Sequence, residues 1–173
     1  LLSEALKPQF EPLLPKLPFL KHVLVPPFKD LLEKSNPALS PAPTTSDDPC
    51  FWLYSSGSTG MPKGTVHVHA SMRQSAELYA KGVVGLKEAD VVFSAAKFFF
   101  AYGLGNSLSF PLAAGATAVL MAERPTPDAV FKRLTARKPT VFYGVPTLYA
   151  AMLASPAFPK KESLNLRTCI SAG

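Results

Sequence analysis

Short apolar runs alternate with helix signals along residues 50–173, and this alternation constrains the fold more than any other feature of the chain. Strands that are separated by helices return to one sheet by crossover connections, which make neighbouring strands parallel. The strand-like runs are residues 50–54, 65–69, 91–95, 116–121, 140–143 and 167–171. The helical segments are residues 71–81, 104–114, 127–137 and 146–154. The sequence therefore predicts an α/β fold, with a layered, largely parallel sheet flanked by helices.

Several helix boundaries carry their own signals. Thr126 precedes Pro127 and Asp128, which is the order of a capping residue, a proline at the first position and an acid in the first turn. Ser71 is the expected N-cap of the helix 71–81. Pro111 is expected to bend the helix 104–114, because it lacks a backbone N–H.

Proline is enriched in the first 49 residues, which hold 10 of the 18 prolines in the chain. We expect a short helix at residues 3–6, a small strand at residues 21–25 and a polar connector over residues 35–49. The chain is thus predicted to have two parts, a proline-rich lead-in over residues 1–49 and a core over residues 50–173.

The net charge of +6 is concentrated in the second part, where 13 basic side chains face 6 acidic ones. No run of lysine and arginine exceeds two residues, so the clustered basic face of a nucleic-acid-binding module is missing. We expect no nucleic-acid partner, and the positive charge instead suits a small substrate that carries phosphates.

Neither a membrane nor a secretory segment is expected. Residues 98–122 carry no charge, but Gly103, Gly105 and Pro111 divide this stretch into pieces too short to span a bilayer. The chain begins without a methionine or a basic leader, which favours a piece of a longer protein over a signal peptide. Its two cysteines, Cys50 and Cys169, are interpreted as buried, inert thiols of a cytoplasmic protein.

Hydroxyl residues, glycines and one lysine fill residues 55–64, directly after a strand-like run. Glycines allow the backbone to approach a ligand closely, and successive N–H groups in such a turn bind anions. Lys63 adds a positive charge, so the segment suits a polyphosphate. It is not the P-loop of NTPases, because Lys63 follows Pro62 rather than a glycine.

The segment 55–64 resembles the phosphate loop of the adenylate-forming superfamily, whose pattern is small-small-Gly-Ser/Thr-Thr-Gly-x-Pro-Lys-Gly. Within that superfamily, residues 94–106 and 139–149 look like the corresponding stretches of benzoate–CoA ligases and their hydroxybenzoate relatives. Residues 171–173, Ser-Ala-Gly, look like the start of a Ser-Ala-Gly-Glu stretch near the substrate and adenine. Many family members carry a histidine where this chain has Phe100, and the phenylalanine favours an aryl-acid substrate.

The resemblance implies part of the large N-terminal domain of an enzyme that adenylates an aromatic carboxylate and then forms a thioester with coenzyme A. It implies ATP, Mg²⁺ and coenzyme A as co-substrates and cofactor. The implied ATP-binding residues are Ser55, Ser56, Gly57, Ser58, Thr59, Gly60, Lys63 and Gly64. The implied aryl pocket is Phe100, Ala101, Tyr102 and Gly103, and the residues next to the adenine and acyl group are Ser171, Ala172 and Gly173.

Other interpretations remain open at this point. One alternative is an adenylate-forming enzyme for a fatty acyl or amino acyl substrate, and another is a nucleotide-binding module without catalysis. The resemblance places the adenylation lysine in a C-terminal domain of the same protein, so no catalytic residue is assigned here and the piece alone is expected to be inactive. No metal site is assigned either, because His67 and His69 have no further ligand nearby in sequence. Lys97 is left unassigned, either reaching an anion or pointing outward.

Overall fold

The structure is a computed structural model that describes residues 1–55 and 60–172. The chain divides into two compact units, one of residues 1–43 and one that begins at Thr44, and each is described by itself. Residues 44–48 belong to the second unit through backbone hydrogen bonds: the N–H of Ala70 donates to the carbonyl of Ser46 at 2.9 Å, and that of His69 to Asp48 at 3.2 Å.

The first unit consists of short helical turns. They are the 3₁₀ turn Glu4–Leu6, helix α1 (Lys7–Phe10), the 3₁₀ segment Glu11–Lys16 and helix α2 (Lys29–Glu33). The strand expected at residues 21–25 is wrong, since this stretch has no ladder partner and Pro26 and Pro27 after it lack N–H donors. All residues of this unit are described and none is buried, so it has no core of its own.

An antiparallel hairpin opens the second unit. Strand β1 (Pro49–Ser55) pairs with strand β2 (Lys63–Val68), with Ser55 opposite Lys63 at the end next to the connecting loop. The rings of Phe51 and His67 stack across the pair, with centroids 4.9 Å apart and planes 9° from parallel. Both strands were expected, although β2 ends before His69, which begins the following helix.

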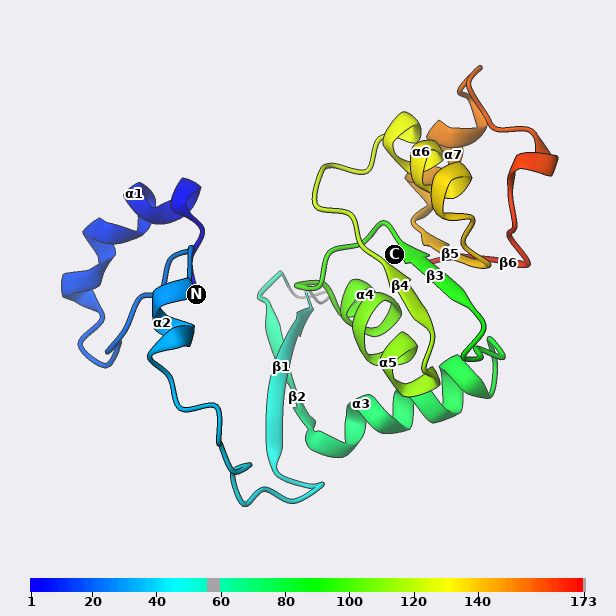
Figure 1. The fold of residues 1–173 in the computed structure, drawn as a ribbon. Coiled ribbons are helices and arrows are strands. Elements are labelled where there is room, and N and C mark those ends of the chain that lie inside the picture. The colour runs from blue at the N-terminus through cyan, green and yellow to red at the C-terminus, as the bar shows by residue number, and fades with distance from the viewer. Residues whose placement is uncertain (56–59, 173) are drawn as a thin grey trace. The chain divides into compact units, whose positions relative to one another are not determined.

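A separate four-stranded sheet forms the centre of the unit, and all its strands are parallel (Figure 1). It is built from β3 (Val91–Ser94), β4 (Thr117–Val119), β5 (Val141–Gly144) and β6 (Thr168–Ser171). The order across the sheet is β4-β3-β5-β6. This arrangement confirms the predicted α/β class with a parallel sheet flanked by helices.

The helices of the unit connect these strands. They are α3 (His69–Ser75) with a π-helical continuation Ala76–Lys81, α4 (Ala101–Leu104), a π-helical segment Gly105–Ser109, α5 (Phe110–Ala114), α6 (Pro127–Arg137), α7 (Pro146–Leu153) and the 3₁₀ turn Lys161–Ser163. The cap of α6 is confirmed, because the Thr126 hydroxyl accepts from the N–H of Ala129 at 3.4 Å. The expected Ser71 cap is wrong. Helix α3 begins two residues earlier, and the Ser71 hydroxyl, inside the first turn, accepts from the N–H of Val68 at 3.2 Å.

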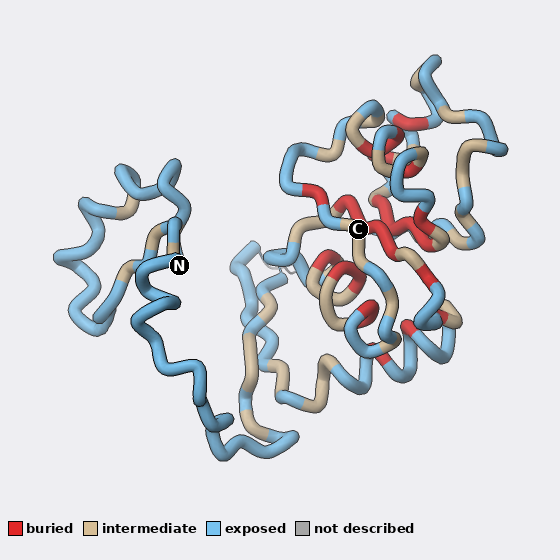
Figure 2. The backbone as a smooth tube through the Cα atoms, viewed as in Figure 1, coloured by how far each residue is buried: buried red, intermediate tan, exposed pale blue. Residues whose placement is uncertain are grey.

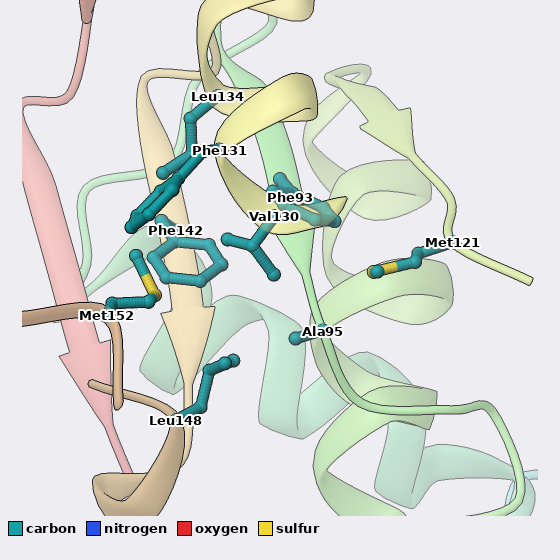
Figure 3. Close-up of a cluster of buried hydrophobic side chains, with 9 residues drawn as sticks. All are labelled: Phe93, Ala95, Met121, Val130, Phe131, Leu134, Phe142, Leu148 and Met152. Carbon is teal, nitrogen blue, oxygen red and sulfur yellow. The ribbon is translucent and has the colours of Figure 1, made fainter. Parts of the chain in front are cut away.

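Two apolar clusters lie on opposite faces of the parallel sheet, because successive strand residues point to opposite sides. Figure 2 shows that the buried backbone concentrates in the sheet and the helices against it. One cluster packs α6 and α7 on Phe93 and Phe142 (Figure 3), whose rings are 5.3 Å apart. The other packs the α3 continuation and α5 on Val92, Val141 and Tyr143.

No helix in residues 1–55 and 60–172 is both long enough and apolar enough to cross a membrane. The uncharged stretch 98–122 is instead divided among α4, the π-helical segment, α5 and β4.

Candidate active site

The chain leaves β3 and β5 toward opposite faces of the sheet. After β3 it enters α4 and α5, where Tyr102 and Phe110 pack with the cluster around Tyr143. After β5 it enters α7, where Leu148 and Met152 pack with the cluster around Phe142. Neighbouring strands whose connections diverge in this way leave a crevice at their carboxyl ends, and ligands of open α/β sheets bind in such crevices.

A cavity of about 370 Å³ occupies this position. Residues from the carboxyl ends of all four parallel strands line it. They are Ala95, Ala96, Lys97, Phe100 and Tyr102 after β3, Pro125 after β4, Gly144 at the end of β5 with Val145 and Leu148 after it, and Ala172 after β6. Among the described residues, Lys97 and Tyr102 are the only polar side chains in this lining. The volume is that of a small organic ligand.

Three residues that the sequence singled out meet in this cavity: Phe100, Tyr102 and Ala172. The lining does not include Ala101 or Gly103. Gly103 has a packing reason, because a Cβ there would stand 2.0 Å from the carbonyl oxygen of Lys97. Its small size therefore lets α4 lie against the chain that leaves β3.

Sequence reasoning missed the cavity residues on the far connections, including Pro125, Val145 and Leu148. Their signal is positional, because each lies within a few residues of the end of a parallel strand. A run of three phenylalanines, residues 98–100, is typical of a buried core. None of the three is buried, since they lie in the turn between β3 and α4.

Tyr102 reaches across the ends of β5 and β6. Its hydroxyl lies 3.2 Å from the carbonyl oxygens of Gly144 and of Ile170, which share its single donor proton. Its ring meets the ring of Tyr143 edge-on, with centroids 6.1 Å apart. Burial raises the pKa of Tyr102 to about 12, so it remains a neutral donor at physiological pH.

Lys97 neither reaches an anion nor points freely outward. Its ammonium group donates to three successive backbone carbonyls after β4, those of Met121 at 2.5 Å, Ala122 at 2.9 Å and Glu123 at 2.7 Å. These three bonds use all three donors of the group. The cavity wall therefore receives the aliphatic stem of Lys97 rather than its charge.

The expected phosphate loop is the connection of the β1–β2 hairpin. Ser55 ends β1, Lys63 begins β2, and Gly60 adopts a positive φ of 80° that favours glycine. Gly64 lies under the ring of Tyr54, where a Cβ would come within 3.1 Å of Cζ. The other loop residues of the expected site, Ser56, Gly57, Ser58 and Thr59, fall outside the described residues, as does Gly173.

Ser171 and Ala172 lie at the end of β6, beside β5. Ser171 is the ladder partner of Gly144, and the N–H of Ala172 donates to the Gly144 carbonyl at 3.4 Å. Cys169, on the same strand, is exposed rather than buried, because β6 is the edge of the described sheet. Among residues 1–55 and 60–172, no three His, Cys, Asp or Glu side chains come together as a metal site.

The model of the family described as AMP-binding enzyme matches residues 3–173, nearly the whole chain. The chain belongs to the AMP-binding enzyme family. Its parallel sheet with flanking helices matches the N-terminal domain of adenylate-forming enzymes.

Individual relatives of this family are named for aromatic acids. The chain is 59% identical over 177 residues to a benzoate–CoA ligase of Thauera aromatica, covering 99% of this chain and 34% of that protein. It is 53% identical over 146 residues to a 4-hydroxybenzoate–CoA/benzoate–CoA ligase of Rhodopseudomonas palustris, covering 83% of this chain and 27% of that protein. The chain thus spans about a third of the length of these relatives.

Solved structures agree with the fold. A benzoate CoA ligase from Burkholderia xenovorans superposes with a TM-score of 0.85 at 52% identity, over 99% of this chain and 35% of that one. An anthranilate CoA ligase in complex with anthranoyl-AMP superposes with a TM-score of 0.88 at 36% identity, over 98% of this chain and 35% of that one.

Proposed function

We propose that the full-length protein containing this chain joins a benzoate-like aromatic acid to coenzyme A, cleaving ATP to AMP and pyrophosphate. The observation that carries the proposal is the apolar cavity at the ends of four parallel strands. Its two polar side chains, Lys97 and Tyr102, are both committed to backbone carbonyls. Walls of this kind suit an uncharged aromatic ring, and relatives at 59% and 53% identity carry the name benzoate–CoA ligase.

The proposed reaction has two steps. A carboxylate oxygen of the acid attacks the α-phosphorus of ATP, the bond from that phosphorus to the bridging oxygen breaks, and pyrophosphate leaves. The sulfur of coenzyme A then attacks the acyl carbon, and AMP leaves as the thiol proton is lost. In the first step two anions approach each other, so the site has to surround the phosphates with positive charge and fixed N–H donors.

We assign the phosphate contacts to the hairpin loop. The proposed residues are Ser55, Ser56, Gly57, Ser58, Thr59, Gly60, Lys63 and Gly64. The exposed position of Lys63 at the start of β2 supports this, because a lysine side chain there places a mobile positive charge beside the loop. Mg²⁺ enters with ATP, and since the described residues gather no acidic cluster, we expect its protein ligands in the remainder of the protein.

We assign the acid to the cavity, with Phe100 and Tyr102 in one wall and Ala172 next to the acyl group and adenine. Ala101 and Gly103 belong to the same helix α4 and support that wall, and Ser171 and Gly173 adjoin Ala172 in the sequence. Coenzyme A and the C-terminal domain of the same protein are the remaining partners. A cytoplasmic location fits the two free thiols, Cys50 and Cys169.

The decisive experiment is ATP–pyrophosphate exchange by the full-length protein, with benzoate, 4-hydroxybenzoate, 2-aminobenzoate and octanoate as separate acids. Exchange with aryl acids but not octanoate is the expected result. Exchange that depends on octanoate alone would replace the aryl assignment by a fatty acyl one. ATP binding without exchange for any acid would contradict the enzymatic proposal altogether.

The phosphate assignment has its own test in Lys63→Ala and Thr59→Ala. We expect each variant to raise the KM for ATP by about tenfold, equivalent to ~1.4 kcal/mol, while the KM for benzoate changes little. Lys160→Ala removes another exposed lysine of the chain and is the matched control. Unchanged ATP affinity and turnover in both loop variants would refute the assignment.

A further inference from the structure

A second cavity lies next to the proposed acid site. Its volume is about 350 Å³, close to that of the first. Ala96 and Lys97 line both cavities. The remaining walls of the second are largely apolar, with Phe98, Phe99, Leu120 and Met121 among them.

The side chain of Lys97 is fixed where the two cavities meet. Its backbone follows β3, and its ammonium group is held by the carbonyls of residues 121–123, after β4. Residues 121–123, whose carbonyls bind the ammonium group, contribute Met121 to the second cavity. Pro125, two residues after Glu123, lines the first cavity. A stem fixed at both ends cannot swing aside without losing three hydrogen bonds to backbone carbonyls.

One buried hydroxyl in the wall of the second cavity has no hydrogen-bond partner among the described residues. It belongs to Ser107, on the π-helical segment, which is 5% exposed. Ser107 lines the second cavity and is absent from the lining of the first. Ser94, the other buried serine of this lining, accepts from the N–H of Ala96 at 3.3 Å. An apolar cavity with a few buried hydroxyls has the general character of a small-molecule site.

The position of Lys97 relative to Ala172 sets the direction in which an acid would extend. Ala172 follows β6, and Lys97 follows β3, two strands away in the order β4-β3-β5-β6. At a usual strand spacing of ~4.8 Å, the two ends of the first cavity are about 10 Å apart. That length accommodates a single aromatic ring with its carboxylate at the Ala172 end.

We propose that Lys97 is a specificity-determining residue: its anchored stem closes the acid cavity and separates it from the second cavity, which limits the acid to one ring. The inference rests on the proposed function, because it concerns the acid that this site takes. Shortening the stem joins the two cavities and opens room for a second ring in the para position, lined by Phe98, Leu120 and Met121.

The test compares benzoate with biphenyl-4-carboxylate in ATP–pyrophosphate exchange by the full-length protein. The quantity measured is the ratio of kcat/KM for the two acids. Wild type is expected to favour benzoate strongly, and Lys97→Ala is expected to raise the relative use of biphenyl-4-carboxylate at least about tenfold, since a pocket discriminates by that much for small changes in size. Lys97→Met keeps an unbranched stem but not the carbonyl bonds that anchor it, so its ratio should lie between those of wild type and Lys97→Ala.

A double variant locates the added ring. In Lys97→Ala with Ser107→Leu, the leucine fills the second cavity, and the gain with biphenyl-4-carboxylate should disappear. Loss of fold alone would not produce a gain with the larger acid or its reversal. If Lys97→Ala does not fold, as judged by its thermal midpoint, Lys97→Val provides a shortened stem that retains apolar volume, and the same direction of change is expected.

The outcomes separate this inference from the proposed function. Normal exchange with benzoate and an unchanged ratio in the shortened variants would overturn the role of Lys97 and leave the function standing. Wild-type use of biphenyl-4-carboxylate as efficient as that of benzoate would also overturn it, without any variant. No exchange with any aryl acid would overturn both.

Discussion

Arg167 and Asp90 form a two-pronged ion pair at the amino ends of the parallel strands, with Nε to Oδ1 at 2.9 Å and Nη2 to Oδ2 at 2.7 Å. Asp90 directly precedes β3 and Arg167 directly precedes β6. Thr140, directly before β5, donates from its hydroxyl to Oδ1 of Asp90 at 2.6 Å. One carboxylate thus ties three strands together at the edge opposite the cavity.

We expect Arg167→Met to lower the free energy of unfolding by about 2–4 kcal/mol, because it leaves the nearly buried Asp90 carboxylate without its cation. The figure is kept below that of a fully buried pair, since the Arg167 side chain is 40% exposed. Asp90→Asn should cost less. The double variant should lower the free energy of unfolding by less than the sum of the two single variants, because no unpaired charge then remains at this site. Urea denaturation of all four proteins measures the coupling, and strict additivity would show that the pair contributes no coupling energy.

The same pair predicts a loss of stability in acid. The Arg167 guanidinium, with help from Thr140 and the N–H of Lys87, holds the pKa of Asp90 well below its usual range. A lowered pKa in the folded state stabilises the fold above the unfolded pKa of ~3.9, and this contribution declines as the pH falls below that value. Wild type should therefore lose stability below about pH 4 more steeply than Asp90→Asn. Glu162→Gln, which removes an exposed acid, should follow the wild-type curve.

The spacing of apolar residues along the sequence was sufficient to predict the parallel sheet and its flanking helices, because strands and helices impose different repeats on apolar residues. The sequence also predicted Phe100, Tyr102 and Ala172 through its resemblance to adenylate-forming enzymes, and these residues meet in one cavity. The sequence could not predict where the ammonium group of Lys97 binds, since its three carbonyl acceptors lie 24 to 26 residues further along the chain. A backbone carbonyl is present at every residue and leaves no signature in a sequence. The strand expected at residues 21–25 failed for the converse reason: local β propensity forms no strand without a partner.

Gly103 and Gly105 differ in what surrounds them, and this predicts an order of severity. A Cβ at Gly103 would stand 2.0 Å from the backbone oxygen of Lys97, whereas one at Gly105 would meet the ring of Phe110 at 3.0 Å. Backbone within a packed turn cannot move aside, but a ring can shift by a few tenths of an ångström. Gly103→Ala should therefore displace α4 and raise the KM for the acid by tenfold or more. Gly105→Ala should raise it much less. Equal KM values in the two variants would contradict the packing role of Gly103.

Two tyrosine hydroxyls converge on one carbonyl at the end of β6. Tyr102 comes from the face of the sheet that carries α4, Tyr149 from the face that carries α7, and each hydroxyl lies 3.2 Å from the oxygen of Ile170. Either hydroxyl alone still satisfies that oxygen, so we expect Tyr102→Phe and Tyr149→Phe each to cost at most about 1 kcal/mol. The double variant should cost more than the sum, since the carbonyl then loses both donors from side chains.

Alkaline pH should act on the same two contacts. Burial raises the pKa of Tyr102 to about 12 and that of Tyr149 further still. A raised pKa in the folded state means that this contribution to stability is complete below the unfolded value of ~10 and is lost as the pH rises above it. Thermal midpoints of wild type should therefore decline above about pH 10, and those of the double phenylalanine variant should decline less steeply.

The double phenylalanine variant should also raise the KM for the acid at pH 8, because Ile170 directly precedes Ser171 and Ala172. An unchanged KM there, together with additive losses of stability, would limit the two hydroxyls to independent and purely local contacts.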